Sequence, residues 1–204
     1  MKVHDYHEGN RELQDQFQTR DLADWQSKER VTETVNDDQR AFIESANMFF
    51  LATCDHRGLP TCSYKGGDPG FVKVVDGHTI AFPSYDGNGK FQSMGNLLKN
   101  PNVGILFVDF DGQQRLRLQG VASIKDDDEL LGEYAEAQVI VRVALTEVYK
   151  NCPRYVHKLQ FVETSAYVPR HGKDTPQPEW TKMPELSGLS HPKWGSLGPK
   201  SVGD

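Results

Sequence analysis

Residues 79–110 read TIAFPSYDGNGKFQSMGNLLKNPNVGILFVDF, and the rest of the chain is arranged around the pieces of this stretch. Its first piece, residues 79–84, is a short apolar run that predicts a β-strand cut off by Pro83. Its second piece, residues 85–90, is a polar loop that contains two glycines and ends in Lys90. This order predicts a strand that leads directly into an exposed loop.

The second half of the stretch predicts a short helix followed by a buried strand. Four apolar side chains recur at helical spacing. They are Phe91, Met94, Leu97 and Leu98. Pro101 ends this helix, because the residue before a proline is disfavoured in the α region. Residues 103–110 then form a continuous apolar run of strand length, which is typical of a buried strand.

The loop at residues 85–90 has the composition of an anion site. A strand, a glycine-bearing loop and a helix start bring several backbone N–H groups and one ammonium group towards a single point, where phosphate is the expected anion. Lys90 would supply the charge, and Ser84, Asn88 and Ser93 would supply neutral hydrogen bonds. An ordinary polar turn explains the same residues, since the loop contains neither a Walker motif nor a GxGxxG motif.

The composition limits the classes of protein to which the chain can belong. A length of 204 residues predicts one domain with additions, or two small ones, with a sizeable core. A formal charge of -6 argues against a general nucleic-acid binder, which usually presents a basic surface. No apolar run approaches the roughly 20 residues that span a bilayer, and the polar start does not resemble a signal peptide. We therefore expect a cytoplasmic protein that binds neither nucleic acid nor membrane.

Neither the cysteines nor the histidines form a recognised pattern. Cys54, Cys62 and Cys152 are too few and too irregularly spaced for a disulfide framework or a CxxC motif. The seven histidines are scattered and include no HExxH grouping, so we expect no metal site. The acidic run at residues 126–129 is interpreted as the solvated start of a short helix.

Segments of different composition precede and follow a central domain at residues 36–168. Residues 1–35 are highly charged, with apolar residues at helical spacing, which predicts an amphipathic helix broken near Arg20. We expect this segment to pack across the central domain or against a partner subunit. Residues 169–204 are rich in proline and glycine and predict an extended arm without a core of its own. The arm is expected to lie against another surface, because it carries two tryptophans.

The central domain is predicted to be mainly β with flanking helices and six to seven strands. Besides residues 103–110, the runs with strand character are residues 48–53, 60–65, 71–75, 79–82, 115–124 and 138–148. A helix capped by Asn36 or Asp37 precedes them, a bulge is expected at Gly120, and Cys152 with Pro153 suggests the start of another helix. Closure of the strands into a small barrel would remove exposed edges.

Four segments of this domain, in this order, resemble the pyridoxamine 5'-phosphate oxidase-like superfamily, the split β-barrels that bind FMN. They are FLAT at residues 50–53 with PTCS at 60–63, IAF at 80–82 with the loop to Lys90, NLLKNPNVGILF at 96–107, and LRLQGVA at 116–122. The resemblance covers residues 37–167 and is to an uncharacterised branch rather than to pyridoxamine 5'-phosphate oxidase itself. Ser63 stands where that enzyme has an arginine, and Lys90 stands alone where it has an Arg-Lys pair.

The resemblance implies a homodimer with FMN in the groove between the subunits. The residues that match the family's cofactor contacts are Ser63, Tyr64, Lys65, Ser84, Asn88, Gly89, Lys90, Ser93, Asn96, Arg117 and Gln119. By position, residues 63–65 would lie beside the flavin, residues 84–93 would hold its phosphate with Asn96 behind them, and residues 117 and 119 would reach the partner's cofactor. On sequence alone, Lys65 is equally explained as an exposed lysine at a strand end.

Cys152 and Arg154 are candidates for a substrate pocket. A thiol at a helix start beside an arginine would have a lowered pKa, although the same residues also suit a helix start with no chemical role.

The resemblance implies an FMN-dependent oxidoreductase that moves two electrons between FMN and a small molecule or a nicotinamide. The sequence contains no Ser-His-Asp or paired-carboxylate signature, which agrees with a flavin that carries the chemistry itself. Two alternatives remain open. One is a flavin-binding or redox-sensing module without turnover. The other is a barrel that holds a deazaflavin or haem, for which His157 or His171 would be the candidate haem ligand.

Overall fold

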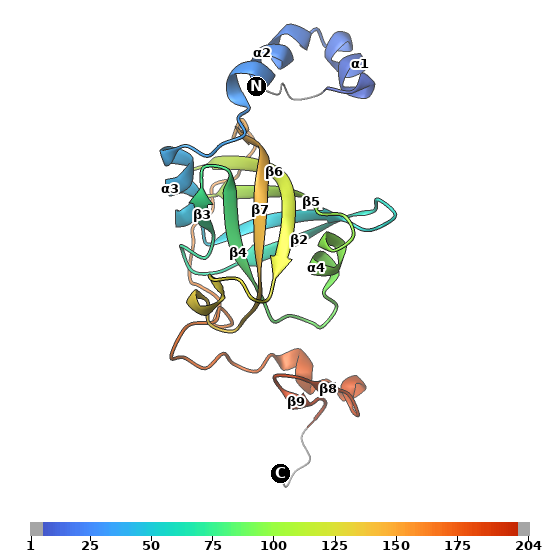
Figure 1. The fold of residues 1–204 in the computed structure, drawn as a ribbon, viewed down its shortest axis with the longest axis vertical. Coiled ribbons are helices and arrows are strands. Elements are labelled where there is room, and N and C mark those ends of the chain that lie inside the picture. Colours follow the sequence, from blue (N-terminus) through green and yellow to red (C-terminus); the bar gives the residue numbers. More distant parts are fainter. Residues whose placement is uncertain (1–5, 200–204) are drawn as a thin grey trace.

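The computed structural model describes residues 6–199, so residues 1–5 of the expected N-terminal segment and 200–204 of the expected arm lie outside the described residues. The strands of the central domain are β1 (Met48–Cys54), β2 (Pro60–Gly66), β3 (Lys73–Asp76), β4 (Thr79–Tyr85), β5 (Asn102–Asp109), β6 (Gln114–Lys125) and β7 (Ala137–Lys150). They form one seven-stranded sheet in the order β2-β1-β5-β6-β7-β4-β3 (Figure 1). Every pairing is antiparallel. The mainly β fold that the sequence predicts is confirmed, as an open split barrel with β2 and β3 at its edges rather than a closed one.

The sheet curls so that strands far apart in its order face each other across the core. Phe49 on β1 and Phe82 on β4 have ring centroids 4.9 Å apart, although three strands separate β1 from β4 in the sheet. Phe107 on β5 and Phe71 on the loop before β3 pack on the same Phe49 ring, at 5.3 and 5.7 Å. All four side chains are buried, so this aromatic cluster fills the inside of the curl.

Strand β6 alternates between the core and the outer face of the sheet. Leu116 and Leu118 are buried, whereas Arg117 and Gln119 between and after them are exposed. The register of β6 against β7 shifts between Gln119 and Gly120, which confirms the expected bulge. A Cβ at Gly120 would lie 2.4 Å from the Ala144 carbonyl oxygen, so a side chain there would collide with the neighbouring backbone.

Strand β4 continues through Pro83 to Tyr85, so the expectation that the proline cuts the strand off is wrong. Strand β3 pairs with β4 only as far as Ala81, while β7 pairs with it along its whole length. Beyond Ala81 one edge of β4 is therefore open. A proline without an N–H group is tolerated where a strand has an open edge.

Two helices cover the barrel. Helix α3 (Asp37–Ser45) begins with a capping box in which Asn36 and Gln39 exchange hydrogen bonds, and it buries Ile43. Helix α4 (Gln92–Leu97) buries Met94 and Leu97. Phe91 and Leu98, which were predicted on the same apolar face, are 55% and 73% exposed. The helix is only six residues long, so residues beyond its two ends do not share its buried face.

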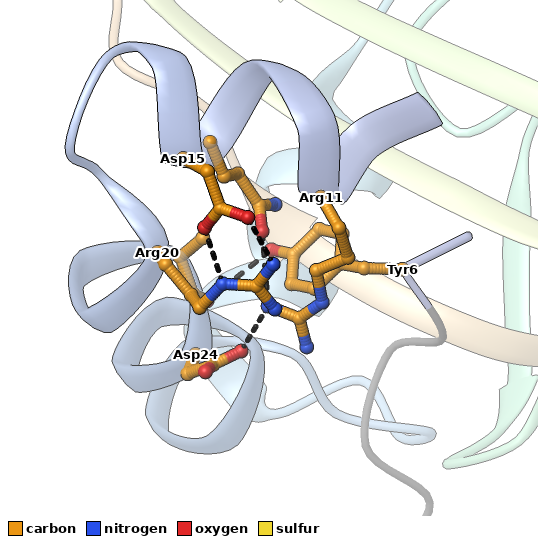
Figure 2. Close-up of polar contacts among 7 residues, drawn as sticks. Tyr6, Arg11, Asp15, Arg20 and Asp24 are labelled. Atoms are coloured by element: carbon orange, nitrogen blue, oxygen red, sulfur yellow. Dashed lines mark hydrogen bonds and ion pairs between the residues drawn. The ribbon is translucent and has the colours of Figure 1, made fainter. Parts of the chain in front are cut away.

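The N-terminal segment forms a helical hairpin of α1 (Glu8–Gln16) and α2 (Arg20–Arg30), broken near Arg20 as the sequence predicts. Figure 2 shows the ion pairs that join the two helices, Arg20 with Asp15 at 2.5 Å and Arg11 with Asp24 at 2.7 Å. The hairpin lies beyond one end of the barrel rather than across its surface (Figure 1).

Thr32 ties the hairpin to the barrel, because its backbone exchanges two hydrogen bonds with Val148 of β7. Four large apolar side chains of the hairpin remain 49% to 67% exposed. They are Leu13, Phe17, Leu22 and Trp25. Packing of this segment against a partner subunit stays a prediction.

The segment after β7 is not helical, so the helix predicted at Cys152 and Pro153 is wrong. One turn forms where Val156 N–H donates to the Pro153 carbonyl, but Leu159 N–H then donates to Phe110 at the end of the β5 strand region. The backbone of this segment is therefore satisfied partly by the barrel instead of by continued helical bonds.

The C-terminal arm folds at the opposite end of the barrel (Figure 1). It contains the 3-10 turns η2 (Glu179–Lys182) and η3 (Pro184–Leu186) and a small hairpin of β8 (Ser190–His191) and β9 (Gly195–Ser196). Arg170 pairs with Asp68 of the barrel at 2.6 Å, and His191 lies 3.5 Å from Asp86. The arm thus lies on its own chain, and its tryptophans, Trp180 and Trp194, line a cavity against the loop after β4. None of the helices within residues 6–199 is both long and apolar enough to cross a membrane.

A buried ion pair fixes the connection between β6 and β7, which includes the turn η1 (Leu131–Glu133). The Asp128 side chain is only 2% exposed and receives two hydrogen bonds from the Arg142 guanidinium, at 2.6 and 2.9 Å. The hydrogen bonds from Arg142 lower the pKa of Asp128 to about 2, against 3.8 for an ordinary aspartate.

We predict that Asp128→Asn lowers the free energy of unfolding by about 3 kcal/mol at pH 7, because it leaves Arg142 without its buried partner. A depressed pKa contributes stability that is present above pH 3.8 and is lost as the pH falls through about 2. The cost of the substitution should therefore shrink over this window in urea unfolding. The exposed neighbour Asp127→Asn serves as the control. An equal cost at pH 7 and at pH 2 would contradict this account.

Candidate functional site

A pocket of about 240 Å³ lies between β2, the end of β4 and α4. Seven of the residues that match the family's cofactor contacts line it. They are Ser63, Lys65, Ser84, Asn88, Gly89, Lys90 and Ser93. The structure thus brings together residues that are up to 30 positions apart in the sequence.

Two serines join the walls of the pocket. Ser63 on β2 and Ser93 on α4 have their hydroxyl oxygens 3.1 Å apart. This hydrogen bond holds the first turn of α4 beside β2, so the loop between β4 and α4 closes the pocket between them. Both hydroxyls can also turn towards a bound group, since a hydroxyl both donates and accepts.

The lining of the pocket is positively charged. It contains Lys65 and Lys90, and among the described residues that line it there is no carboxylate. Lys90 is exposed on the loop, whereas Lys65 is half-buried on β2, and burial lowers the pKa of its ammonium group. Two cations and three serine hydroxyls fit the phosphate of a nucleotide cofactor.

Asp86 is an acidic residue of the loop that does not itself line the pocket. Its Oδ1 accepts a hydrogen bond at 3.3 Å from Gln138, which does line the pocket, and lies 3.5 Å from His191 of the arm. The carboxylate is therefore next to the lining and is held there by Gln138 and His191.

Asn96 supports the pocket from behind rather than lining it. Its Nδ2 donates to Thr53 Oγ1 at 3.0 Å and to Thr61 Oγ1 at 3.4 Å, and the two hydroxyl oxygens are 2.9 Å apart. Thr53 is buried. The network therefore fixes α4 to the hairpin of β1 and β2.

The start of α4 contributes less than the sequence suggested. Phe91, the residue that precedes the helix, has a left-handed backbone with φ of 48° and provides no side-chain cap. The Lys90 N–H group already donates to Asn88 Oδ1 at 3.2 Å. Among the residues that line the pocket, the groups that carry positive charge are the ammonium groups of Lys65 and Lys90.

Three other predicted cofactor residues lie on the outer face of the sheet and do not line the pocket. Tyr64 is 63% exposed and packs edge-on against Phe50, with ring centroids 6.2 Å apart. Arg117 and Gln119 are exposed on β6. Register across the sheet puts Tyr64, Phe50, Leu106 and Arg117 in one row. Their contact with a partner's cofactor stays a prediction.

Neither of the two predicted substrate-pocket residues lines this pocket. Cys152 is exposed at the edge of a separate cavity of about 500 Å³ near α2. Arg154 is exposed outside that cavity, with its guanidinium 6.0 Å from the centre of the Tyr155 ring. No helix forms at Cys152, so the helix start that was expected beside this thiol is absent.

Sequence reasoning missed several lining residues. They are Tyr85, Gly87, Phe91, Gln92, Met94 and Gln138. Most of them adjoin the predicted loop, so their positions beside Lys90 were a usable signal. Gln138 comes from β7, and only the pairing of Tyr85 with Ala137 brings it near. Burial raises the pKa of Tyr85 to about 12.

The candidate haem ligands lie away from the pocket. His157 is exposed, and His171 Nε2 lies 3.2 Å from the Glu133 carbonyl oxygen. Within residues 6–199, no three histidine, cysteine or acidic side chains gather in a way that would hold a metal ion.

Solved structures with a similar fold share little sequence with this chain. The HupZ protein of Group A Streptococcus is 16% identical, with a TM-score of 0.47, over 62% of this chain and 99% of its own. A putative pyridoxamine 5'-phosphate oxidase of Lactobacillus delbrueckii is 19% identical, with a TM-score of 0.47, over 58% and 95%. An FMN-binding protein of Syntrophomonas wolfei is 11% identical, with a TM-score of 0.44, over 71% and 96%.

The family itself is identified from the sequence. No curated protein matches the chain. The sequence model of the family described as pyridoxamine 5'-phosphate oxidase matches residues 35–162, which is more than half of the chain. This match spans the whole barrel and confirms the resemblance found in the four sequence segments. The chain therefore belongs to the pyridoxamine 5'-phosphate oxidase family.

Proposed function

We propose that the protein is an FMN-dependent oxidoreductase that transfers two electrons between FMN and a small molecule or a nicotinamide. The observation that carries the proposal is the pocket around Ser63, Ser93 and Lys90, which has the charge of a phosphate site in a chain of this family. Lys65 approaches the pocket from β2 and Lys90 from the loop, so a phosphate dianion between them would meet two cations.

The chain would bind and orient the cofactor rather than supply acid–base groups. FMN supplies the two-electron chemistry when it is bound. The Ser63–Ser93 bridge and the Asn96 network hold the walls of the phosphate site at a fixed separation. With Ser63 in place of the arginine of pyridoxamine 5'-phosphate oxidase, the site relies on fewer charges, and a substrate other than pyridoxamine 5'-phosphate is proposed.

The size of the pocket supports a homodimer. Its volume of about 240 Å³ is below the range of roughly 300 to 1,000 Å³ that is usual for small-molecule sites. It suits the phosphate end of FMN, so the flavin ring would extend beyond it. The outer face of β1 and β2 beside it presents Phe50 and exposed Tyr64. A second subunit covering this face would complete the groove and bring Arg117 and Gln119 towards the cofactor.

We predict that the protein binds FMN and that Lys90→Gln weakens this binding about tenfold or more, because one charged contact to the phosphate is lost. Fluorescence titration with FMN measures the effect. Riboflavin, which lacks the phosphate, should bind the variant and the parent alike. Lys99→Gln, an exposed lysine just after α4, is the matched control.

Two results would count against the proposal. If the protein does not bind FMN but binds haem or a deazaflavin in the same titration, its cofactor is not FMN. Equal FMN affinity in the parent and in Lys90→Gln would show that the phosphate of FMN does not bind beside Lys90. Steady-state oxidation of a nicotinamide by the FMN-loaded protein separates an oxidoreductase from a binding module without turnover.

Lys65 should make FMN affinity depend on pH. Burial lowers its pKa below the ordinary 10.5, and a bound phosphate dianion favours the charged ammonium. Affinity should therefore be full while Lys65 is protonated and should fall as the pH rises through the lowered pKa. The phosphate itself stays a dianion above about pH 7. FMN titrations from pH 7 upwards should show a decline in the parent that Lys65→Met lacks. Identical pH profiles in the parent and in Lys65→Met would exclude Lys65 from the phosphate site.

A further inference from the structure

We propose that a second ligand site, for a planar aromatic anion, lies where α2 and α3 meet the start of β6 and the end of β7. A cavity of about 500 Å³ lies there, within the usual size range of small-molecule sites. We call it the α2 cavity. The side chains that give it its chemistry are Trp25, Arg30, Phe42, Arg115, Lys150 and Asn151.

The charge of the α2 cavity is opposite to that of the chain. The chain has 29 acidic and 23 basic residues, yet Arg30, Arg115 and Lys150 line this cavity and, among the described residues, no carboxylate does. No ion pair joins any of the three to a carboxylate within residues 6–199. Three uncompensated cations around one cavity favour an anionic ligand.

The walls of the cavity favour a flat apolar ring. The Arg30 guanidinium lies over one face of the Trp25 ring, 5.2 Å from its centre, and the side chain of Trp25 is still 49% exposed, so an aromatic surface and a positive charge lie together. Phe42 of α3 is partly buried on another side of the same cavity. An aromatic ring would stack or pack against these residues, while its acidic group would meet the cations.

One polar atom in the lining lacks a partner. Asn151 Oδ1 is buried and accepts no hydrogen bond from the described part of the chain. A buried polar atom without a hydrogen bond is costly and calls for an explanation. This atom has almost no accessible surface in the cavity, so a bound ring would not reach it, and the ligand is defined by the cations and the aromatic side chains instead. The predicted ligand is therefore an aromatic carboxylate, sulfonate or phosphate.

The α2 cavity is separate from the proposed FMN site. The two pockets share no lining residue. Lys150 and Gln138 belong to one cavity each and lie twelve residues apart on β7, which is roughly 40 Å along a strand. Trp25 and Arg30 also precede residue 35, where the family match begins. The site is therefore built partly from this chain's own N-terminal helices and goes beyond the proposed function.

Isothermal titration calorimetry of the full chain tests the proposal, with 1-naphthoate as the probe and the uncharged 1-naphthalenemethanol as its isostere. We expect naphthoate to bind at least about tenfold more tightly than the alcohol. The double variant Arg30→Gln/Lys150→Gln should lose this preference. The matched control is the exposed Lys28→Gln on the same helix. Neither Arg30 nor Lys150 forms an ion pair within the described residues, so thermal unfolding of the double variant should change only through the lost contact of Arg30 with the Trp25 ring.

Alkylation of Cys152 locates the bound probe. This thiol is exposed at the cavity, while Cys62 is exposed on β2. Mass spectrometry after iodoacetamide treatment should show slower labelling of Cys152 in the presence of naphthoate and unchanged labelling of Cys62.

Three results would overturn the proposal. They are equal affinity for naphthoate and the alcohol, unchanged naphthoate affinity in the double variant, and competition of FMN with naphthoate. Competition would mean that the α2 cavity is part of the FMN site, either within one subunit or where two subunits meet. Failure of FMN binding alone would leave the α2 cavity untouched and would count only against the proposed oxidoreductase.

Discussion

The contact of Phe49 with Phe82 bends the sheet, and the pocket depends on that bend. The two rings come from strands separated by three others, so they meet only if the sheet curls around its own core. The curl leaves β2 as an open edge and lets α4 pack through Met94 and Leu97 against the barrel. Ser63 and Ser93 then lie within hydrogen-bond distance. The pocket beside Ser63 and Ser93 is thus a consequence of how the aromatic core closes.

Much of the fold could be predicted from the sequence, because the side chains that are buried recur along the sequence with the spacing of a strand or a helix. The apolar run before Cys54 and the alternation around Leu118 both appear as strands. The wrong predictions concern residues whose local conformational preference is overridden by contacts with distant parts of the chain. Pro83 suits β4 because its outer edge is open at that point. The helix expected at Cys152 did not form, because the backbone that follows bonds partly to the barrel.

The part of the candidate site that is continuous in the sequence could be predicted. The loop that ends at Lys90 carries its own signal, while Ser63 and Lys65 were placed by the family resemblance. Gln138 could not have been found, because its approach depends on the register of β4 against β7. The cavity around Trp25 and Lys150 was equally hidden, since helical periodicity does not say where a surface helix docks.

Two cation-lined cavities lie at opposite ends of one long strand in an acidic chain, and we propose both as anion sites. We also propose that a partner subunit completes the first. Native mass spectrometry of the protein with excess FMN tests it, because subunits and cofactors are counted in one spectrum. The account predicts a dimer that carries two FMN molecules and loses them when it dissociates. A monomer that retains FMN, or a dimer that remains free of it, would contradict the account.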